Sequence, residues 1–363
     1  MYNQFNMKKE LILLYGGRSG EHEVSLRSAA SVYNHLNKDL YNTTLIGLSK
    51  EGLWYNQDAP VDKCETLPLV EDSDRLVRLL PMEGISWGDR TIKPDVVFPL
   101  IHGTFGEDGT LQGLLEMCGF PYVGATSGGS YLGMDKEMAK IIWKHRGLNV
   151  IPFRSIRRCN YEEDQRETVH KELMDQLGLP LFVKPSMAGS SVGVSRVDRA
   201  EKLEEALLYA FQFDSKALVE TAIKGKEIEC SVIGNHVTQS FPPGEIASNH
   251  EFYDYEAKYI DPDGALLIIP AELEEKTSEE LRIIAGKAYE ALDLRGFARV
   301  DFFVEESGKI ILNEVNTIPG FTSISMFSMM CEVGGLPYPQ MLDRLIELAI
   351  EQFAERSALK FFI

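Results

Sequence analysis

The sequence predicts an α/β fold that begins with a parallel sheet, and three observations carry this prediction. Apolar runs that end near glycine alternate with amphipathic helical stretches over the first third of the chain. The chain has 363 residues, enough for two to three domains. Further along, a charge-bearing β-hairpin stands inside a strongly apolar region. Strand–helix–strand alternation of this kind is typical of a parallel sheet covered by helices.

The first third of the chain contains both predicted strands and predicted helices. Strands are predicted where Leu, Ile, Val and Phe run together, and helices where apolar residues recur every three to four positions. The predicted strands are 10–17, 43–49, 95–101 and the short 121–124, and the predicted helices are 24–36 and 110–118. Residues 50–94 are polar and rich in turn formers, and they carry no motif that we can interpret.

The remainder of the chain continues to mix strands and helices. A helix that starts near Ser130 ends at Gly147, which is a natural helix stop. The later predicted strands are 151–157, a pair within 181–197, 217–223, 227–234 and a hairpin over 296–317, and the helices are 161–177, 199–212, 277–292 and 338–356.

Composition and charge limit the possible functions. The hydrophobic fraction of 44% and the charged fraction of 25% are ordinary for a globular protein. The formal charge of -18 disfavours a nucleic-acid partner, because binding to that backbone depends on cationic side chains. The five cysteines are scattered and form no metal motif, which favours reduced thiols. No secretory segment and no membrane span is recognisable, so we expect a cytoplasmic protein without a membrane partner.

The nucleotide signals are unusual. The sequence contains neither a G-x-G dinucleotide fingerprint nor a GxxxxGK[ST] phosphate loop. It does contain LFVKPSMAGSSVGVSRV (181–197), two strands joined by a loop of Gly, Ser and Ala. Small residues let backbone amides approach phosphate oxygens, and the ammonium of Lys184 could lie over them. The alternative is an ordinary flexible hairpin loop.

The hairpin 296–317 carries charge on one face. Its first strand alternates between two sets of residues, so that each set lies on one face. One face carries Ala298, Val300, Phe302 and Val304, and the other carries Arg299, Asp301 and Phe303. A two-residue turn at Ser307-Gly308 would set Asp301 opposite Glu314 and Arg299 opposite Asn316. Opposed carboxylates repel unless a cation offsets them, and oxygen ligands suit Mg²⁺. The alternative is a solvent-exposed face with Lys or Arg partners.

These segments resemble the ATP-grasp superfamily and, within it, the D-alanine–D-alanine ligases. The similar segments run in the family's order through nearly the whole chain from Met7 onward. They are GGRSGEHEVSLRSA (16–29), HGTFGEDGTLQG (102–113), MDK (134–136), VKPSMAGSSVGVS (183–195), EFYDYEAKY (251–259), GFARVDFF (296–303) and NEVNTIPGFTSIS (313–325).

The resemblance implies a three-domain ATP-grasp architecture with a Rossmann-like N-terminal α/β domain. The expected domains are 1–130, 131–223 and 224–363, with ATP held between the second and third. The implied nucleotide-binding residues are Lys136, Lys184, Ser191, Glu220, Ala222, Ile223, Glu227 and Lys258. Asp301, Glu314 and Asn316 would hold two divalent ions, Mg²⁺ or in its place Mn²⁺, and a homodimer is expected.

The resemblance also implies an amino-acid site. Glu23 would bind the ammonium of a first D-alanine and join Ser190 and Tyr259 in a hydrogen-bonded set, with His102 nearby. Glu23 reads equally well as a carboxylate stabilised at a helix N-terminus. The residues implied for the second D-alanine and the oxyanion are Arg299, Gly320, Ser325 and Met326.

The implied reaction joins two D-alanine molecules through an acyl phosphate. Such an intermediate hydrolyses if water reaches it, and the tyrosine-rich loop 250–261 suits the role of a lid. Two rivals stay open. Another ATP-grasp carboxylate–amine ligase need not keep Glu23, Ser190, Tyr259 and Ser325, all of which are present. A non-catalytic ATP-binding module would have lost a metal ligand or Arg299, and neither is lost.

Replacement of Tyr259 tests the choice of second substrate. We expect Tyr259→Phe to break the link to Ser190 and to admit D-lactate, which mass spectrometry of the products would detect. Unchanged product selectivity would count against this role for Tyr259.

Overall fold

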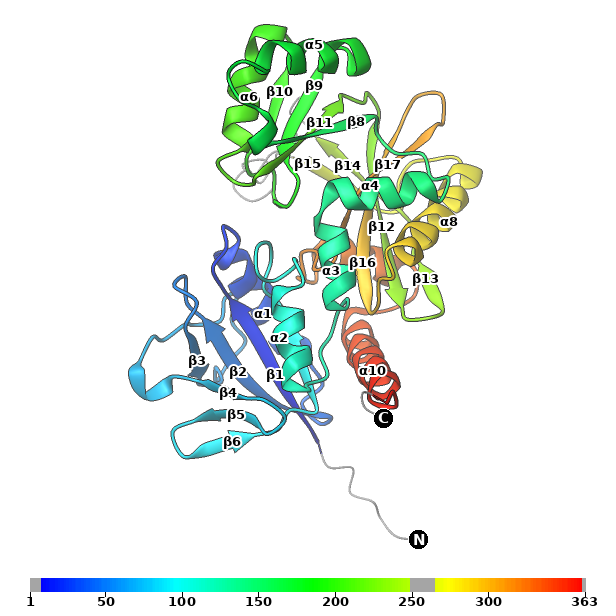
Figure 1. Ribbon diagram of the computed structural model, residues 1–363. Coiled ribbons are helices and arrows are strands. Elements are labelled where there is room, and N and C mark those ends of the chain that lie inside the picture. Colours follow the sequence, from blue (N-terminus) through cyan, green and yellow to red (C-terminus); the bar gives the residue numbers. More distant parts are fainter. Residues whose placement is uncertain (1–7, 249–264, 361–363) are drawn as a thin grey trace.

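The computed structural model describes residues 8–248 and 265–360. Figure 1 shows an N-terminal part built on β1 and β2, a separate part that carries α5 and α6, and a third part around β12 and β16, with α10 beside it. Four sheets form within these ranges.

The N-terminal sheet has the order β3-β2-β1-β7. β1 pairs in parallel with both β2 and β7, as predicted, and β3 adds an antiparallel edge. Its strands and helices are β1 (Lys9–Gly16), β2 (Tyr41–Leu48), β3 (Trp54–Gln57), β7 (Val96–Pro99), α1 (His22–His35) and α2 (Thr110–Cys118). At the turn into α1, Gly16 has φ of +86°, and a Cβ there would lie 2.3 Å from the carbonyl oxygen of Leu48. Only glycine fits this turn.

Residues 50–94, which carried no interpretable motif, contribute β3 to the N-terminal sheet and also form a small antiparallel sheet of order β4-β5-β6. Its elements are β4 (Arg78–Leu80), β5 (Gly84–Trp87), β6 (Arg90–Ile92) and the preceding 3₁₀ turn at Ser73–Arg75. Ile85 is fully buried against the main N-terminal core, so this sheet extends that core.

The next sheet is antiparallel in the order β10-β9-β11-β8. Its elements are β8 (Phe153–Arg157), β9 (Leu181–Pro185), β10 (Ser195–Val197), β11 (Lys216–Thr221), α5 (Arg166–Leu177) and α6 (Leu203–Ala210), with 3₁₀ turns at Arg158–Asn160 and Ala200–Lys202. α5 and α6 supply Leu173, Leu203 and Leu207 to the core of this sheet. The loop between β9 and β10 is therefore anchored at both ends by paired strands.

The third large sheet holds six strands within the described residues. Its elements are β12 (Lys226–Gly234), β13 (Thr238–Ser240), β14 (Gly244–Ser248), β15 (Ala265–Ile268), β16 (Phe297–Val304), β17 (Ile310–Asn316), α8 (Glu275–Ala291) and α9 (Met326–Val333). β16 shows the predicted alternation, with Ala298, Val300 and Phe302 in the core beneath α8. Arg299 and Asp301 therefore point to the opposite face.

The predicted hairpin register is confirmed where the charges lie. Asp301 faces Glu314 and Arg299 faces Asn316. The predicted two-residue turn is wrong, because a β-bulge after Asp301 shifts the pairing so that Phe302 faces Leu312. Asn313 has no opposite residue, and residues 305–309 join the strands. The longer turn and the bulge offset each other by one residue, which leaves the charged positions in the expected register.

Two helices connect the N-terminal sheet to the rest, α3 (Ser127–Met134) and α4 (Lys136–His145). Asp135 ends α3 and caps α4 by accepting hydrogen bonds from the amides of Glu137 and Met138. Trp143 is fully buried and donates a 2.9 Å hydrogen bond to the carbonyl of Ala288 on α8. The division at 130 and 223 stays a prediction. The body of α4 packs on α8 and β17 of the third part, and its first residues also contact the second sheet through Lys216 and Ser186.

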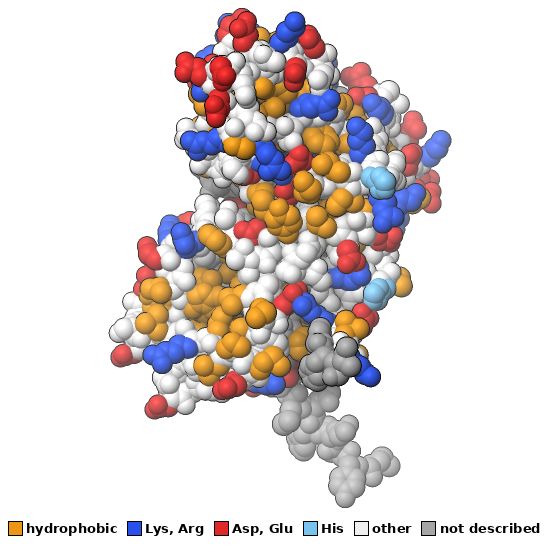
Figure 2. Space-filling view, viewed as in Figure 1, with side chains coloured by type: hydrophobic (Ala, Val, Ile, Leu, Met, Phe, Trp, Pro, Cys, Tyr) orange, Lys and Arg blue, Asp and Glu red, His pale blue; other side chains and the backbone are white. Residues whose placement is uncertain are grey.

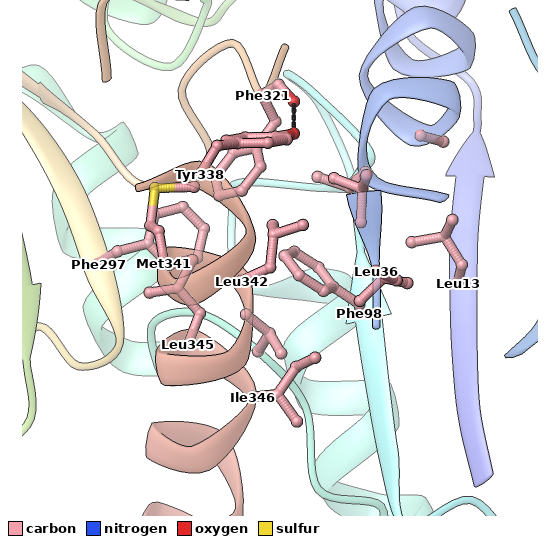
Figure 3. Packing of buried hydrophobic residues seen from close by; sticks show 14 of the residues in the cluster. Leu13, Leu36, Phe98, Phe297, Phe321, Tyr338, Met341, Leu342, Leu345 and Ile346 are labelled. Atoms are coloured by element: carbon pink, nitrogen blue, oxygen red, sulfur yellow. Dashed lines mark hydrogen bonds between the residues drawn. The ribbon is translucent and has the colours of Figure 1, made fainter. Parts of the chain in front are cut away.

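The last helix, α10 (Tyr338–Ser357), joins two parts of the molecule through one core. Figure 3 shows Leu342, Leu345 and Ile346 of α10 between Phe98 of the N-terminal sheet and Phe297 of β16. Tyr338 donates a 2.6 Å hydrogen bond to the carbonyl of Phe321. The N-terminal sheet is thus fixed against the third sheet by buried apolar surface.

Candidate active site

A cleft of about 1660 Å³ opens where the three large sheets meet. Side chains from all three parts line it within the described residues. The predicted site residues that line the cleft are His102, Lys136, Lys184, Ser190, Ser191, Glu220, Ala222, Ile223, Glu227, Arg299, Glu314, Asn316, Gly320, Ser325 and Met326. Glu23 and Asp301 are not on its surface. Lys258 and Tyr259, and the predicted lid 250–261, lie outside the described residues.

The floor of the cleft is the charged face of the hairpin. Arg299 donates to both carboxylate oxygens of Asp301 at 2.8 and 2.7 Å, and its Nε lies 3.1 Å from a carboxylate oxygen of Glu229. Asn316 Nδ2 donates to Asp301 at 2.9 Å. Burial alone would lower the pKa of Arg299, but Asp301 and Glu229 raise it above its usual range. The cationic Arg299 therefore offsets part of the repulsion that the sequence argument assigned to a metal.

Glu229 was not predicted as a site residue. It faces Asp301 from the neighbouring strand β12, so three acidic side chains meet on adjacent strands of one face. Among the residues that the structure describes, no group of three or more His, Cys, Asp or Glu side chains is arranged to hold a metal ion. The predicted ligand set contains two carboxylates and the amide of Asn316, which is a different donor combination.

The glycine-serine loop forms one wall of the cleft. Ser190 and Ser191 both have positive φ values, +49° and +59°, which non-glycine residues rarely adopt. Such strained positions concentrate at ligand-binding segments. Lys136 extends to this loop, donating to the carbonyl of Ala188 at 2.8 Å, and its ammonium lies 3.6 Å from Glu314. Lys136 thus connects the loop to the charged floor.

Lys184 belongs to a buried ion triad. One carboxylate oxygen of Glu220 lies 2.6 Å from Lys184 and the other lies 2.7 Å from Lys140. Lys140 also donates at 2.7 Å to the carbonyl of Asn313, the unpaired residue of the bulge. Burial lowers the pKa of Lys140 to about 8. Glu220 stays ionised between the two ammonium groups, because they outweigh its burial and lower its pKa.

The structure corrects the predicted partner of Ser190. Ser190 donates a short hydrogen bond to the carboxylate of Glu21, not Glu23. Glu23 points outward, with 62% of its side chain exposed, and forms a 2.6 Å ion pair with Lys50. Gly103 has a φ of +73°, which favours glycine, and a Cβ there would lie 2.8 Å from the other oxygen of Glu21, so the carboxylate packs closely on this backbone. Glu21 therefore joins the N-terminal part to the glycine-serine loop.

His102 and Glu107 hold the segment that follows β17. His102 Nδ1 donates to the carbonyl of Ile318 at 2.9 Å, and Ser28 donates to His102 Nε2 at 2.9 Å. These partners suit a neutral ring with its proton on Nδ1, and burial lowers the pKa of His102, which favours that neutral form. The carboxyl of Glu107 accepts hydrogen bonds from the amides of Gly103 and Ile318. Both peptide groups at Ile318 are thus bound from the N-terminal part.

Ser325 caps α9 at the far end of the cleft. Its hydroxyl accepts a 3.0 Å hydrogen bond from the amide of Thr322 and lies 2.8 Å from the Thr322 hydroxyl. A Cβ on Gly320 would lie 3.2 Å from the Ser325 oxygen, so the peptide of Gly320 passes close by. Gly320, Thr322 and Ser325 of this turn line the same cleft as Arg299 and Asn316.

The wall opposite the floor is less polar. Ala222 and Ile223 follow β11, and the amide of Ala222 donates at 3.0 Å to the carbonyl of Pro180. Glu227 stands on β12 at the rim. Apolar side chains beside carboxylates in the lining of a cleft suit a heterocycle with polar substituents.

The chain is similar to known proteins over nearly its whole length. The family model described as "D-ala D-ala ligase N-terminus" matches residues 10–125, and the one described as "D-ala D-ala ligase C-terminus" matches residues 142–347. A D-alanine–D-alanine ligase of Treponema denticola is 46% identical, over 96% of this chain and 98% of the relative.

Two solved structures have the same fold over nearly the whole chain. The D-alanine–D-alanine ligase of Coxiella burnetii has a TM-score of 0.83 at 34% identity, covering 96% of each chain. The VanG D-Ala:D-Ser ligase of Enterococcus faecalis has a TM-score of 0.82 at 35% identity, covering 94% of this chain and 99% of its own.

The buried Glu107 carboxyl predicts a pH dependence of stability. Burial, reinforced by the charge of Glu21, raises its pKa to about 8. A group with a raised folded pKa stabilises the fold fully below its unfolded pKa of about 4.3, and this stabilisation is lost as the pH rises through the folded pKa. Glu107→Gln removes the titration, so its free energy of unfolding should fall less between about pH 5 and about pH 8 than that of the wild type. Urea unfolding at several pH values in this range measures the free energy of unfolding of the wild type and of the variant. The same pH dependence in the two proteins would contradict the expectation.

Proposed function

Because the chain belongs to the D-alanine–D-alanine ligase family, we propose that it joins two D-alanine molecules at the expense of ATP. The observation that carries this proposal is the contact of Ser190 with Glu21 at a cleft whose floor carries Arg299, with Asp301 bound to Arg299 beneath that surface. The product, D-alanyl-D-alanine, would serve as a precursor of peptidoglycan in the cytoplasm. The cytoplasmic location is proposed because the reaction consumes ATP. Among the described residues, no helix has the length and apolar content to cross a bilayer.

ATP binding is proposed between the second and third sheets. Ala222 and Ile223 would contact adenine, with Glu220 at its edge and Glu227 on the ribose hydroxyls. Lys136 and the amides at Ser190 and Ser191 would contact phosphate oxygens. Lys184 is also proposed to contact a phosphate. Its ammonium lies 2.6 Å from Glu220, which supports a position for Lys184 between the adenine and the phosphates. Lys258 remains a proposed nucleotide contact from its sequence alone.

Asp301, Glu314 and Asn316 are the proposed ligands of two divalent ions. Their hard oxygen donors are the kind that Mg²⁺ and Mn²⁺ prefer, and opposed positions on β16 and β17 bring the two carboxylates together. The amide nitrogen of Asn316 donates to Asp301, so the amide oxygen points away from Asp301 and is the atom proposed to bind the metal. Bound there, Mg²⁺ would offset charge on the phosphates.

The first step proposed is attack of a D-alanine carboxylate oxygen on the γ-phosphorus of ATP, which forms D-alanyl phosphate and releases ADP. Lys136 would stabilise the charge on the transferring group. Glu21 replaces Glu23 as the proposed acceptor for the ammonium of the first D-alanine, because its carboxylate reaches the cleft and that of Glu23 does not. The neutral His102 would help to fix the turn above this site.

In the second step, the free amine of another D-alanine attacks the acyl carbon, phosphate leaves and the amine proton passes to water. Ser325 and Arg299 would bind the carboxylate of this second molecule, with Met326 beside it. Negative charge that develops on the carbonyl oxygen would be stabilised by Arg299 and the amide of Gly320. Tyr259 is proposed to close the site over Ser190.

We also propose a homodimer. Met82 and Met117 are 66% and 78% exposed, and the amide of Met82 donates at 2.9 Å to the carbonyl of Cys118 at the end of α2. Figure 2, viewed as in Figure 1, shows apolar side chains gathered on the surface of the N-terminal part. Apolar side chains grouped on a surface favour contact with another protein surface.

Two matched variants test the corrected assignment. Glu21→Gln removes the charge proposed to bind the first ammonium, so the KM for the first D-alanine should rise about a hundredfold, the loss of one charged hydrogen bond. Glu23→Gln removes a surface charge and should leave this KM within about twofold. Steady-state kinetics at saturating ATP measures both, and an equal effect of the two variants would reject Glu21.

Product analysis tests the reaction itself. We expect phosphate release from ATP with D-alanine but not with L-alanine, and D-alanyl-D-alanine as the main product from mixtures of D-alanine, D-serine and D-lactate. A predominant D-alanyl-D-serine product would instead align the chain with the D-Ala:D-Ser ligase that it resembles in structure.

A further inference from the structure

A buried charge cluster lies behind the glycine-serine loop and outside the cleft. It consists of Lys216 at the start of β11, Asp135 and Glu137 at the start of α4, and Ser186 after β9; we call it the Lys216 cluster. Lys216 is 6% exposed, Asp135 1% and Ser186 fully buried. Neither Lys216 nor Asp135 lines the cleft.

Lys216 provides the positive charge of this cluster. Its ammonium donates to the two oxygens of Asp135 at 2.9 and 2.7 Å and lies 2.7 Å from Glu137. Burial alone would lower the pKa of Lys216, but these carboxylates outweigh burial and raise it. Removal of the ammonium would leave two carboxylates facing each other in a buried place.

The cluster is connected to the cleft through the backbone. The Ser186 hydroxyl donates to Asp135 at 2.8 Å, and the Ser186 amide donates to the carbonyl of Lys216 at 2.9 Å. The carbonyl of Ser186 accepts a 3.1 Å hydrogen bond from the amide of Lys136. Lys136 in turn reaches the carbonyl of Ala188 in the loop. A shift of Asp135 would therefore move both Lys136 and the first residues of the loop.

We propose that Lys216 is a positioning residue for the phosphate end of the nucleotide site, acting by holding Asp135 and thereby Lys136 and the start of the loop in place. The proposal rests on the proposed function, because it requires that Lys136 and the loop bind ATP phosphates. Lys216 itself touches no substrate. The connections of the cluster reach Lys136 and residues 186–188, whereas Ser190 is held separately by Glu21, so the effect of Lys216 should fall on ATP.

Loss of Lys216 is expected to change the KM for ATP but not the KM for D-alanine. In Lys216→Met, the KM for ATP should rise about tenfold or more and kcat should fall, because displacement of a positioned group by about 1 Å is costly. The KM for D-alanine should stay within about twofold. Lys216→Arg keeps the charge but not the compact shape of the ammonium, and it should raise the KM for ATP about threefold in a folded protein.

Arg166→Met is the matched control. Arg166 forms a 2.5 Å ion pair with Glu204 in the same part of the chain, away from the cleft. Thermal unfolding is recorded for all variants, and kinetics and ATP titration without D-alanine are run well below the lowest unfolding temperature. Loss of ATP affinity in the Lys216 variants, with the control unchanged, supports the positioning role.

Two results would overturn the proposal. One is an unchanged KM for ATP in folded Lys216→Met, or in Lys216→Arg if the methionine variant does not fold. The other is an equal rise of both KM values, which is the mark of general destabilisation. Failure of the wild type to bind ATP would reject the proposed function instead, and the two failures are therefore distinguishable.

Discussion

The pairing of charges on the β16–β17 hairpin is the constraint on which the site depends. Arg299 donates two hydrogen bonds to Asp301 and also lies near Glu229. Its positive charge therefore offsets the repulsion between buried carboxylates on adjacent strands. The bulge after Asp301 keeps this register although the turn is longer than two residues. It also leaves the carbonyl of Asn313 outside the strand pairing, where Lys140 binds it.

Ion pairs and hydrogen bonds connect the parts of the chain around that floor. Lys140 connects α4 to the bulge and to Glu220, and Glu220 connects to Lys184 on β9. Glu21 and Ser190 join the N-terminal part to the loop above the floor. Because each contact spans two parts of the chain, the cleft takes its shape only when all the parts are docked. A reaction through a water-sensitive acyl phosphate needs that kind of enclosure.

Sequence reasoning succeeded where a local period determined the geometry. The period of two in β16 correctly placed Arg299 and Asp301 on one face, and the helical period located α2 at its observed bounds. It failed at Glu21 and Glu23, because both stand at the start of the same helix and only the docking of the loop distinguishes them.

The other missed residues are charged side chains whose burial depends on distant contacts. Glu229 offered a signal, since it lies inside the apolar strand EIECSVIG. Lys140 gave a weaker one, three residues before the buried Trp143 on the same helical face. Lys216 and Glu107 gave none, because their partners Asp135 and Ile318 are far away in the sequence.

The central claim is that this charged cleft lets a carboxylate take the γ-phosphoryl group of ATP before the new bond forms. The most direct measurement uses D-alanine labelled with heavy oxygen in its carboxylate, followed by mass spectrometry of the phosphate released during turnover. The account predicts one heavy oxygen in each phosphate, carried over from the acyl phosphate. Phosphate that leaves without the label would contradict it.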